Sequence, residues 1–204
     1  MFCSTKKISV NYNKTPVLKN VSIKIIKGQT TAIIGKNGSG KTTLLRCINC
    51  LIDPTSGSIK HSSNNPFPML FQKPAKFHNT VYYNFEILCK IKKIKPLTKW
   101  YKTFGLEKIS EKNINQVSGG EQQKTYLSRI MSANLKVIIL DEPSQNLDKE
   151  SDRKLIQLLL EEKIQEKTII FSSHDLEMVK QIADKIIYLD NGNVLYEGVP
   201  KNII

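Results

Sequence analysis

The hydrophobic positions near the start of the chain recur at every second residue, the period of a strand with one buried face. Apolar residues alternate over 8–10 and again over 21–25, and polar residues 11–14 lie between the two segments. This pattern predicts two strands joined by a turn. The next apolar run, 30–34, has no polar face and predicts a buried strand, which is followed by a predicted helix over 42–50.

A helical period replaces the strand period in the middle of the chain. Apolar residues there are three or four positions apart, as on one face of a helix, at Val81, Phe85, Leu88 and Ile91. Pro96 ends this helix, and Gly105 is expected to cap a short helix that follows. We therefore expect residues from about 73 to 133 to form a small helical subdomain within a single domain, residues 1–204.

The remaining segments alternate between helix and strand. Helices are predicted over 121–133, 151–163 and 175–184, and strands over 137–140, 168–171, 186–189 and 194–196. Such alternation is typical of a mainly parallel sheet, because parallel strands need a crossover connection, usually a helix. The expected fold class is α/β, with an N-terminal antiparallel β portion, the helical subdomain, and a catalytic core made of residues 1–72 and about 134–204.

Residues 35–42 carry the first candidate chemistry. Their sequence, Gly-Lys-Asn-Gly-Ser-Gly-Lys-Thr, fits the pattern of a phosphate-binding loop and lies between a predicted strand and a predicted helix, as that pattern requires. Glycines let backbone amides point at phosphates, and the helix N-terminus adds partial positive charge. Lys41 is expected to reach the β and γ phosphates, and Thr42 to offer its hydroxyl to Mg²⁺. The residues expected to bind the nucleotide are Gly35, Lys36, Asn37, Gly38, Ser39, Gly40, Lys41, Thr42 and Thr43.

Two adjacent carboxylates follow the strand predicted over 137–140. Parallel sheets bind ligands at the carboxyl ends of their strands, so Asp141 and Glu142 are expected to face the phosphate loop. Asp141 would hold Mg²⁺, and Glu142 would orient or deprotonate the water that attacks the phosphate. Two acids that end a strand more often form a solvated turn, but the complete phosphate loop favours catalysis. Together these motifs predict a P-loop nucleoside triphosphatase.

A second glycine-containing segment, residues 117–123, indicates which class of P-loop nucleoside triphosphatase this chain resembles. Its sequence is Val-Ser-Gly-Gly-Glu-Gln-Gln. Bare amides at a helix start make a second anion site, here at Ser118, Gly119, Gly120 and Glu121. Because the chain already has its own phosphate loop, we expect this site to serve the nucleotide of a partner. The segment resembles the signature motif of the ABC ATPases, and the resemblance covers nearly the whole chain. We call residues 117–123 the signature segment.

The resemblance implies roles for further residues. Tyr12 is implied to stack on adenine, although a strand aromatic in the core is the alternative. Gln72 corresponds to the glutamine that touches Mg²⁺ and the attacking water, and His174 to the histidine that contacts the γ-phosphate. Asp148 ends the crossing loop, residues 144–148, which is implied to reach the partner's site. The implied catalytic residues are Lys41, Gln72, Glu142 and His174, and the implied metal ligands are Thr42, Gln72 and Asp141.

The chain departs from the family pattern at a few positions. Val117 stands where leucine is commoner, Lys124 where arginine is usual, and Gln145 and Asn146 replace smaller residues. None of these changes removes a catalytic group. The resemblance therefore implies a subunit that hydrolyses ATP.

The resemblance also implies partners. Two such subunits, identical or different, would close on two ATP molecules, each held between the phosphate loop of one chain and the Ser118 region of the other. Transmembrane permease subunits would dock a short helix in a groove beside the Gln72 loop, a surface we expect to be less charged than the rest. An external substrate-binding protein is implied as well, and so is a position on the cytoplasmic face of the membrane.

The resemblance favours an importer. Residues 71–74 and 78–81, with Asn84, are similar to those of importers of oxyanions such as tungstate, molybdate or phosphate; lipoprotein or drug exporters are the alternative. The net charge of +13 raises a further alternative, an ABC-type ATPase that acts on nucleic acid or ribosomes. The basic residues are scattered along the chain, however, so nucleic acid is not the expected partner.

The cysteines argue against a zinc site, and the apolar runs argue against a membrane-spanning helix. The four cysteines include one Cys-x-x-Cys pair, which has too few ligands for a tetrahedral zinc site, so reduced thiols are expected. The sequence contains no run of about 18 apolar residues, so no membrane-spanning helix is predicted. We therefore expect a cytoplasmic protein that reaches the membrane through its permease.

Overall fold

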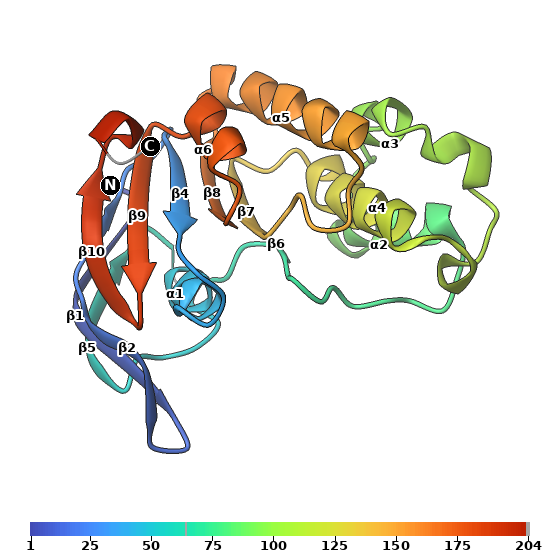
Figure 1. Cartoon of the computed structure of the whole chain (residues 1–204). Helices are drawn as coiled ribbons and strands as arrows, with labels where there is room; N and C mark the ends of the chain where they lie inside the picture. The colour runs from blue at the N-terminus through green and yellow to red at the C-terminus, as the bar shows by residue number, and fades with distance from the viewer. Residues whose placement is uncertain (64, 203–204) are drawn as a thin grey trace.

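A six-stranded, mainly parallel sheet organises the computed structural model, which describes residues 1–63 and 65–202 (Figure 1). The strands lie in the order β10-β9-β4-β8-β7-β6. Neighbouring strands are parallel except β10, which pairs antiparallel with β9. Their bounds are β4 (Thr30–Ile34), β6 (Met69–Leu70), β7 (Val137–Asp141), β8 (Thr168–Ser173), β9 (Lys185–Asp190) and β10 (Asn193–Gly198). The predicted α/β fold class is confirmed.

A second, antiparallel sheet forms from the N-terminal part of the chain. Its strands are β1 (Cys3–Tyr12), β2 (Thr15–Val21), β3 (Lys24–Ile25) and β5 (Ser56–His61), and β1 pairs with the other three. The β1–β2 hairpin turns at residues 13–14, where a turn is predicted. Sequence patterning misses β5, because Ile59 is the only aliphatic residue among six.

The strands of the parallel sheet are apolar on both faces because both faces are covered. Ile33, Ile139 and Ile170 pack with residues of the antiparallel sheet and of α1 (Lys41–Ile48). The alternate positions pack against helices on the other face, including α5 (Lys149–Ile164) and α6 (Leu176–Ile182). This alternation follows from the two-residue period of a strand. The carboxyl ends of β4, β7 and β8 lie at one edge of the sheet, because these neighbouring strands are parallel.

Three helices form the end of the molecule away from β10 (Figure 1). They are α2 (Val81–Lys92), α3 (Lys99–Thr103) and α4 (Gly119–Ser132), and two 3-10 turns, η1 (Leu106–Ile109) and η2 (Ile114–Gln116), lie between α3 and α4 in the chain; a third, η3 (Pro200–Asn202), follows β10. Phe85, Trp100 and Leu127 of these helices belong to the same hydrophobic cluster as Leu140 of the sheet. The boundaries of a helical subdomain at about 73 and 133 stay a prediction.

The apolar face predicted for α2 is only partly covered. Val81 and Phe85 are fully buried and Leu88 is half-buried, but Ile91 is 70% exposed. The predicted helix and its apolar face are therefore present, but the end of that face at Ile91 lies outside the core. Ile91 keeps the predicted side of the helix, but it lines an open groove instead of facing another element. Among residues 1–63 and 65–202, no helix is both long and apolar enough to cross a membrane.

Candidate nucleotide-binding site

The loop between β4 and α1 has the curled backbone expected of a phosphate-binding loop. Gly40 precedes α1 with φ of 106°, and a Cβ atom there would lie 2.8 Å from Leu18 Cδ2. Only glycine fits this conformation without strain. The β9–β10 turn supports the loop, because the amide of Gly192 donates to the carbonyl oxygen of Ser39 at 3.1 Å. The tight turn at Asn191 and Gly192 thus holds the loop in place.

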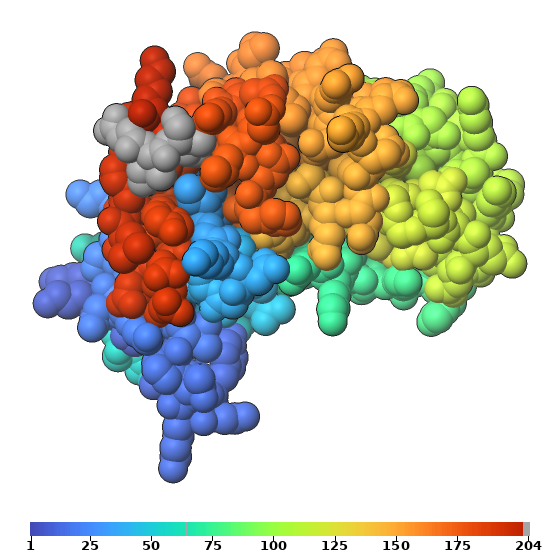
Figure 2. All heavy atoms as spheres, in the orientation of Figure 1, coloured from blue at the N-terminus to red at the C-terminus, as the bar shows by residue number. Residues whose placement is uncertain are grey.

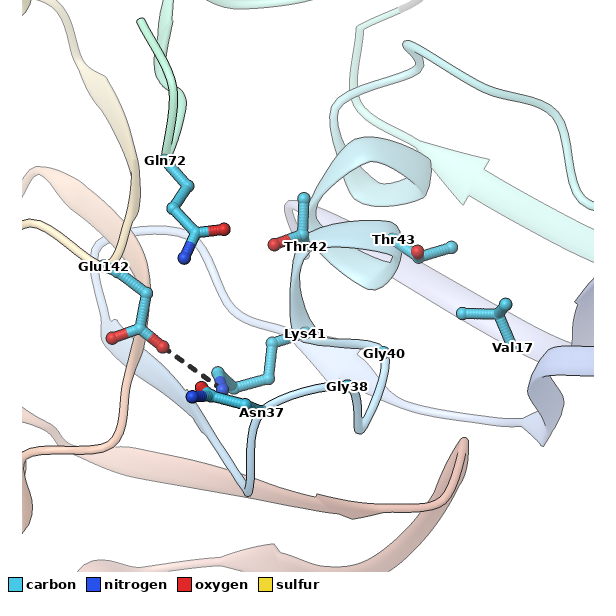
Figure 3. A pocket seen from close by; sticks show the side chains of 9 residues that line it. All are labelled: Val17, Asn37, Gly38, Gly40, Lys41, Thr42, Thr43, Gln72 and Glu142. Carbon is cyan, nitrogen blue, oxygen red and sulfur yellow. Dashed lines mark ion pairs between the residues drawn. The ribbon is translucent and has the colours of Figure 1, made fainter. Parts of the chain in front are cut away.

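A cavity of about 240 Å³ opens over this loop (Figure 3). No atom lies within 4 Å of the Cβ position of Gly38, so the loop's interior is open. The space-filling view shows the light-blue phosphate-loop region in the middle of one face, next to β9 and β10 (Figure 2). The cavity is lined by Val17, Asn37, Gly38, Gly40, Lys41, Thr42, Thr43, Gln72 and Glu142. The fold therefore brings Gln72 and Glu142, distant in sequence, to the predicted loop.

Lys41 is buried and points across the cavity to Glu142 (Figure 3). Its Nζ donates to the carbonyl oxygens of Gly35 at 2.8 Å and Lys36 at 3.3 Å. It also forms an ion pair with Glu142 Oε1 at 3.1 Å. This contact lacks hydrogen-bond geometry, and within the described chain Glu142 Oε1 accepts no hydrogen bond. A phosphate in the loop would thus compete with Glu142 for the Lys41 ammonium.

His174 contacts Glu142 from the opposite side. His174 Nδ1 lies 2.9 Å from Glu142 Oε2, while the rest of the imidazole is largely exposed, at 68% of the side chain. Glu142 itself has φ of 49°, a left-handed conformation that non-glycine residues rarely adopt. Such backbone strain is concentrated at functional sites. The predicted catalytic residues Lys41, Glu142 and His174 therefore form one contiguous chain of side chains.

Asp141 lies beside the loop in a different network. It accepts hydrogen bonds from Thr42 Oγ1 at 2.7 Å and from Ser172 Oγ at 2.6 Å. The amide of Glu142 donates to the same Ser172 oxygen at 2.9 Å. Sequence reasoning missed Ser172. The available signal was its place at the end of a strand parallel to β7, opposite Asp141 in the register.

The donors near Thr42 suit a Mg²⁺ ion. A hydroxyl, a carboxylate and the nearby Gln72 amide offer hard oxygen ligands, and Mg²⁺ in nucleotide sites takes few protein ligands beside water and phosphate. Across the described residues, no cluster of three or more His, Cys, Asp or Glu side chains could hold a metal by itself. Thr42, Asp141 and Gln72 are therefore the residues that fit this ion.

Ser118 begins α4 in a complete capping box. Its side chain accepts from the amide of Glu121, and Glu121 Oε2 accepts from the amide of Ser118 at 2.8 Å and from its hydroxyl at 2.9 Å. These hydrogen bonds hold the pKa of Glu121 below its usual value. None of the signature segment lines the cavity over the phosphate loop. The predicted second anion site is therefore separate from the chain's own loop.

Asp148 also lies away from the cavity and caps α5. It accepts from the amide of Ser151 at 2.8 Å and from its hydroxyl at 3.0 Å, and it pairs with Lys124 of α4 at 3.1 Å. These hydrogen bonds hold the pKa of Asp148 well below its usual range. The bond from the Ser151 backbone amide contributes most, and those from the Lys124 and Ser151 side chains contribute less. The structure thus joins Asp148 to α4, the helix that begins in the signature segment.

Tyr12 is 44% exposed at the end of β1, where the hairpin leaves the sheet. It is therefore not the core aromatic of the alternative interpretation. It does not line the cavity, although Val17 on the next strand does. Its stacking on adenine stays a prediction.

Comparison with known proteins gives one consistent result. The family described as "ABC transporter" matches residues 18–145. The spermidine/putrescine import ATP-binding protein of Fusobacterium nucleatum is 36% identical over 95% of this chain, but the chain spans only 57% of that relative's length. The arginine transport ATP-binding protein of Bacillus subtilis is 30% identical over 96% of this chain and 90% of its own.

A solved structure agrees with these relatives. A dimeric ATP-binding cassette in a post-hydrolysis state, bound to ADP and phosphate, superposes with a TM-score of 0.86. It is 27% identical in sequence, and the alignment covers 98% of this chain and 99% of the cassette.

Proposed function

Because the chain belongs to the ABC transporter family, we propose that it binds and hydrolyses ATP to power transport across a membrane. The observation that carries this proposal is the convergence of Lys41, Gln72 and Glu142 on the cavity over the phosphate loop, with His174 in contact with Glu142. No single helix or loop supplies these side chains. A glycine-rich turn with no ligand would not need a buried lysine, an amide and a carboxylate around it.

Each side chain has a separate task in phosphate hydrolysis. Lys41 leaves Glu142 and neutralises the terminal phosphates, and the loop amides bind their oxygens. Glu142, freed from Lys41, orients the attacking water and accepts its proton, while His174 stabilises the γ-phosphate. Thr42, Asp141 and Gln72 would hold Mg²⁺, which supplies charge neutralisation at the phosphate oxygens when bound.

The site is completed by a second ATPase subunit. Ser118 and Asp148 lie outside the cavity of their own chain, yet they carry the amides and polar groups of an anion site. We propose that they face the nucleotide held by the phosphate loop of the other subunit. The dimeric cassette with ADP and phosphate supports this arrangement by its fold and its dimeric state.

A groove of about 410 Å³ beside the Gln72 loop is the proposed docking site for a permease subunit. Its lining includes only two charged residues, Lys92 and Arg129, and is otherwise mostly apolar. This composition supports the expectation that the surface is less charged than the rest of the molecule. Through this contact the chain would lie on the cytoplasmic face of the membrane. An external substrate-binding protein would deliver the substrate.

The transported substrate is a separate question from the reaction. Residues 71–74 and 78–81 favour oxyanion import, but the relatives are named for spermidine, putrescine and arginine. The spermidine/putrescine relative is named for import, which supports import, and neither relative is named for an oxyanion. We therefore propose import, and the comparisons leave the oxyanion as a sequence-based prediction.

Light scattering of the Glu142→Gln variant tests the proposal. The glutamine keeps the shape of the side chain but cannot accept the proton of water, so the variant should hold ATP and accumulate as a dimer. Glu166→Gln, an exposed change between α5 and β8, is the control: it keeps the Glu142 carboxylate, so it should turn ATP over and should not accumulate as a dimer. A Glu142→Gln variant that stays monomeric in saturating ATP and Mg²⁺ would count against the proposed composite site.

A further inference from the structure

The crossing loop and the start of α4 pack directly against each other in the single chain. A Cβ atom on Gly120 would lie 2.9 Å from the carbonyl oxygen of Asn146, so only a glycine lets the two backbones approach this closely. Gln123 is buried and donates its amide to the carbonyl oxygen of Pro143 at 2.9 Å. Two contacts thus hold the N-terminal side of the crossing loop on α4.

Lys124 adds the third contact, at the C-terminal side of the loop. Its Nζ pairs with Asp148 Oδ2 at 3.1 Å. Lys124 is largely buried, with 16% of its side chain exposed, whereas 62% of the Asp148 side chain is exposed. The lysine is therefore fixed by its surroundings, and the carboxylate is the group that it holds.

Helix capping does not require this ion pair. Asp148 caps α5 through the amide and hydroxyl of Ser151, and these bonds lie within one turn of chain. The Lys124 pair instead joins two segments that are 24 residues apart. Neither Lys124 nor Asp148 lines the cavity over the phosphate loop.

We propose that Lys124 is a positioning residue that locks the signature segment and the crossing loop into one rigid unit, presented to the nucleotide of the second subunit. This inference rests on the proposed composite site. If the unit is preorganised, the subunits close without first ordering the loop, and the ordering cost is removed from association. An exposed ion pair shifts an equilibrium by only about two- to five-fold. A symmetric dimer contains two such units, so the effect on dimerisation is squared, roughly tenfold.

The test uses two variants that break the pair from opposite ends. Lys124→Met removes the charge but keeps the aliphatic stem. Asp148→Asn removes the charge but keeps a good helix cap. Lys154→Met is the matched control, because it breaks another lysine–carboxylate pair, with Glu150 at 2.6 Å, near the start of the same α5. Lys124→Arg should retain the pair.

Amide hydrogen exchange of the full chain without nucleotide gives the first readout. The amides of Gln145 and Leu147 are hydrogen-bonded within the loop, to Glu142 and Ser144, and should report its order. We expect both to exchange several-fold faster in Lys124→Met and Asp148→Asn, and unchanged in Lys154→Met and Lys124→Arg. The double variant should exchange no faster than either single variant, because both remove the same contact.

Dimerisation in ATP, measured by light scattering on the Glu142→Gln background, gives the second readout. We expect Lys124→Met to raise the dimer dissociation constant about tenfold and to leave ATP affinity of the monomer unchanged. Unchanged exchange in the loop, or an equal loss in Lys154→Met, would overturn the proposal. If the Glu142→Gln parent itself does not dimerise, the composite site is wrong, and the exchange data separate that failure from a failure of the Lys124 lock.

Discussion

At the scale of single residues, the most informative group is Glu142. Its carboxylate is held between Lys41 and His174, and its backbone adopts φ of 49°. The sequence predicted all three residues but not their mutual pairing. A motif names the residues of a site, whereas the pairing of a buried ammonium with a carboxylate depends on how the chain packs in three dimensions, because an unpaired buried charge is costly. A phosphate bound by Lys41 would compete with Glu142 for the ammonium.

Two buried thiols predict how stability depends on alkaline pH. Burial raises the pKa of Cys3 and of Cys47 from 9.0 to about 12, with smaller repulsion from neighbouring thiols at both and from Asp53 at Cys47. In the unfolded chain these thiols lose their protons above pH 9, while in the folded chain they keep them. Their stabilising contribution is thus complete below pH 9 and is lost as the pH rises toward 12. The free energy of unfolding should fall by roughly 1 kcal/mol per thiol for each pH unit.

Urea unfolding between pH 9 and 10, under reducing conditions, measures this slope. The variant with Cys3→Ala and Cys47→Ala should be less stable at pH 8 because of the lost packing, but its stability should fall less steeply with pH. The comparison stays below the range where Arg129, whose pKa burial lowers to about 10, would act in the opposite direction. Equal slopes for the variant and the parent would show that these thiols titrate normally in the fold.

At the scale of elements, Arg129 of α4 connects three segments of the helical part. Its guanidinium donates to the carbonyl oxygen of Asn84 at 2.6 Å, to Asn84 Oδ1 at 2.8 Å and to the carbonyl oxygen of Ala75 at 3.0 Å. It also lies over the rings of Phe77 and Tyr126. Arg129 thereby ties the segment that follows Gln72 to α2 and α4.

Replacement of Arg129 by methionine should destabilise the chain by about 2–4 kcal/mol, because two acceptors on the buried Asn84 and the part-buried Ala75 carbonyl lose a donor. Arg129→Lys should recover only part of this loss, since one ammonium cannot reproduce the planar fork. Arg153→Met, an exposed change on α5, is the control and should shift stability by less than about 0.5 kcal/mol. Urea unfolding gives these values, and an Arg129→Met variant as stable as the control would contradict the assigned role.

Long, periodic elements were predictable and short or weakly apolar ones were not. The sequence predicted β4, β7 and β8 because apolar runs are unambiguous when both faces of a sheet are buried. It missed β5, with one aliphatic residue, and β6, which has two residues. Both take their conformation from a neighbouring strand and not from their own pattern.

The parts of the site that neighbouring residues build were also predictable, whereas the parts that join distant segments of the chain were not. The phosphate loop and the capping box at Ser118 were predictable, since neighbouring residues build them. Ser172 was missed, because it meets Asp141 only through the pairing of β7 with β8. The Lys124–Asp148 pair is non-local in the same way: no motif contains both residues, and only the packing of α4 on the crossing loop joins them.

At the scale of the whole molecule, the phosphate loop and the signature segment, the two proposed half-sites, do not meet. The phosphate loop lies at the centre of one face, next to the six-stranded sheet, and the signature segment begins α4 at the far end of the molecule (Figures 1 and 2). The cavity over the loop contains no residue of the signature segment. One chain cannot close both half-sites on the same nucleotide, so the account requires two subunits for turnover.

The most direct test is Mg²⁺-dependent ATP hydrolysis by the purified chain, measured over a wide range of protein concentration. The account predicts that activity per subunit rises with concentration and reaches a plateau, and that Glu142→Gln is inactive throughout. Activity per subunit that is independent of concentration, from a chain that stays monomeric in ATP, would contradict the central claim that two chains build each site.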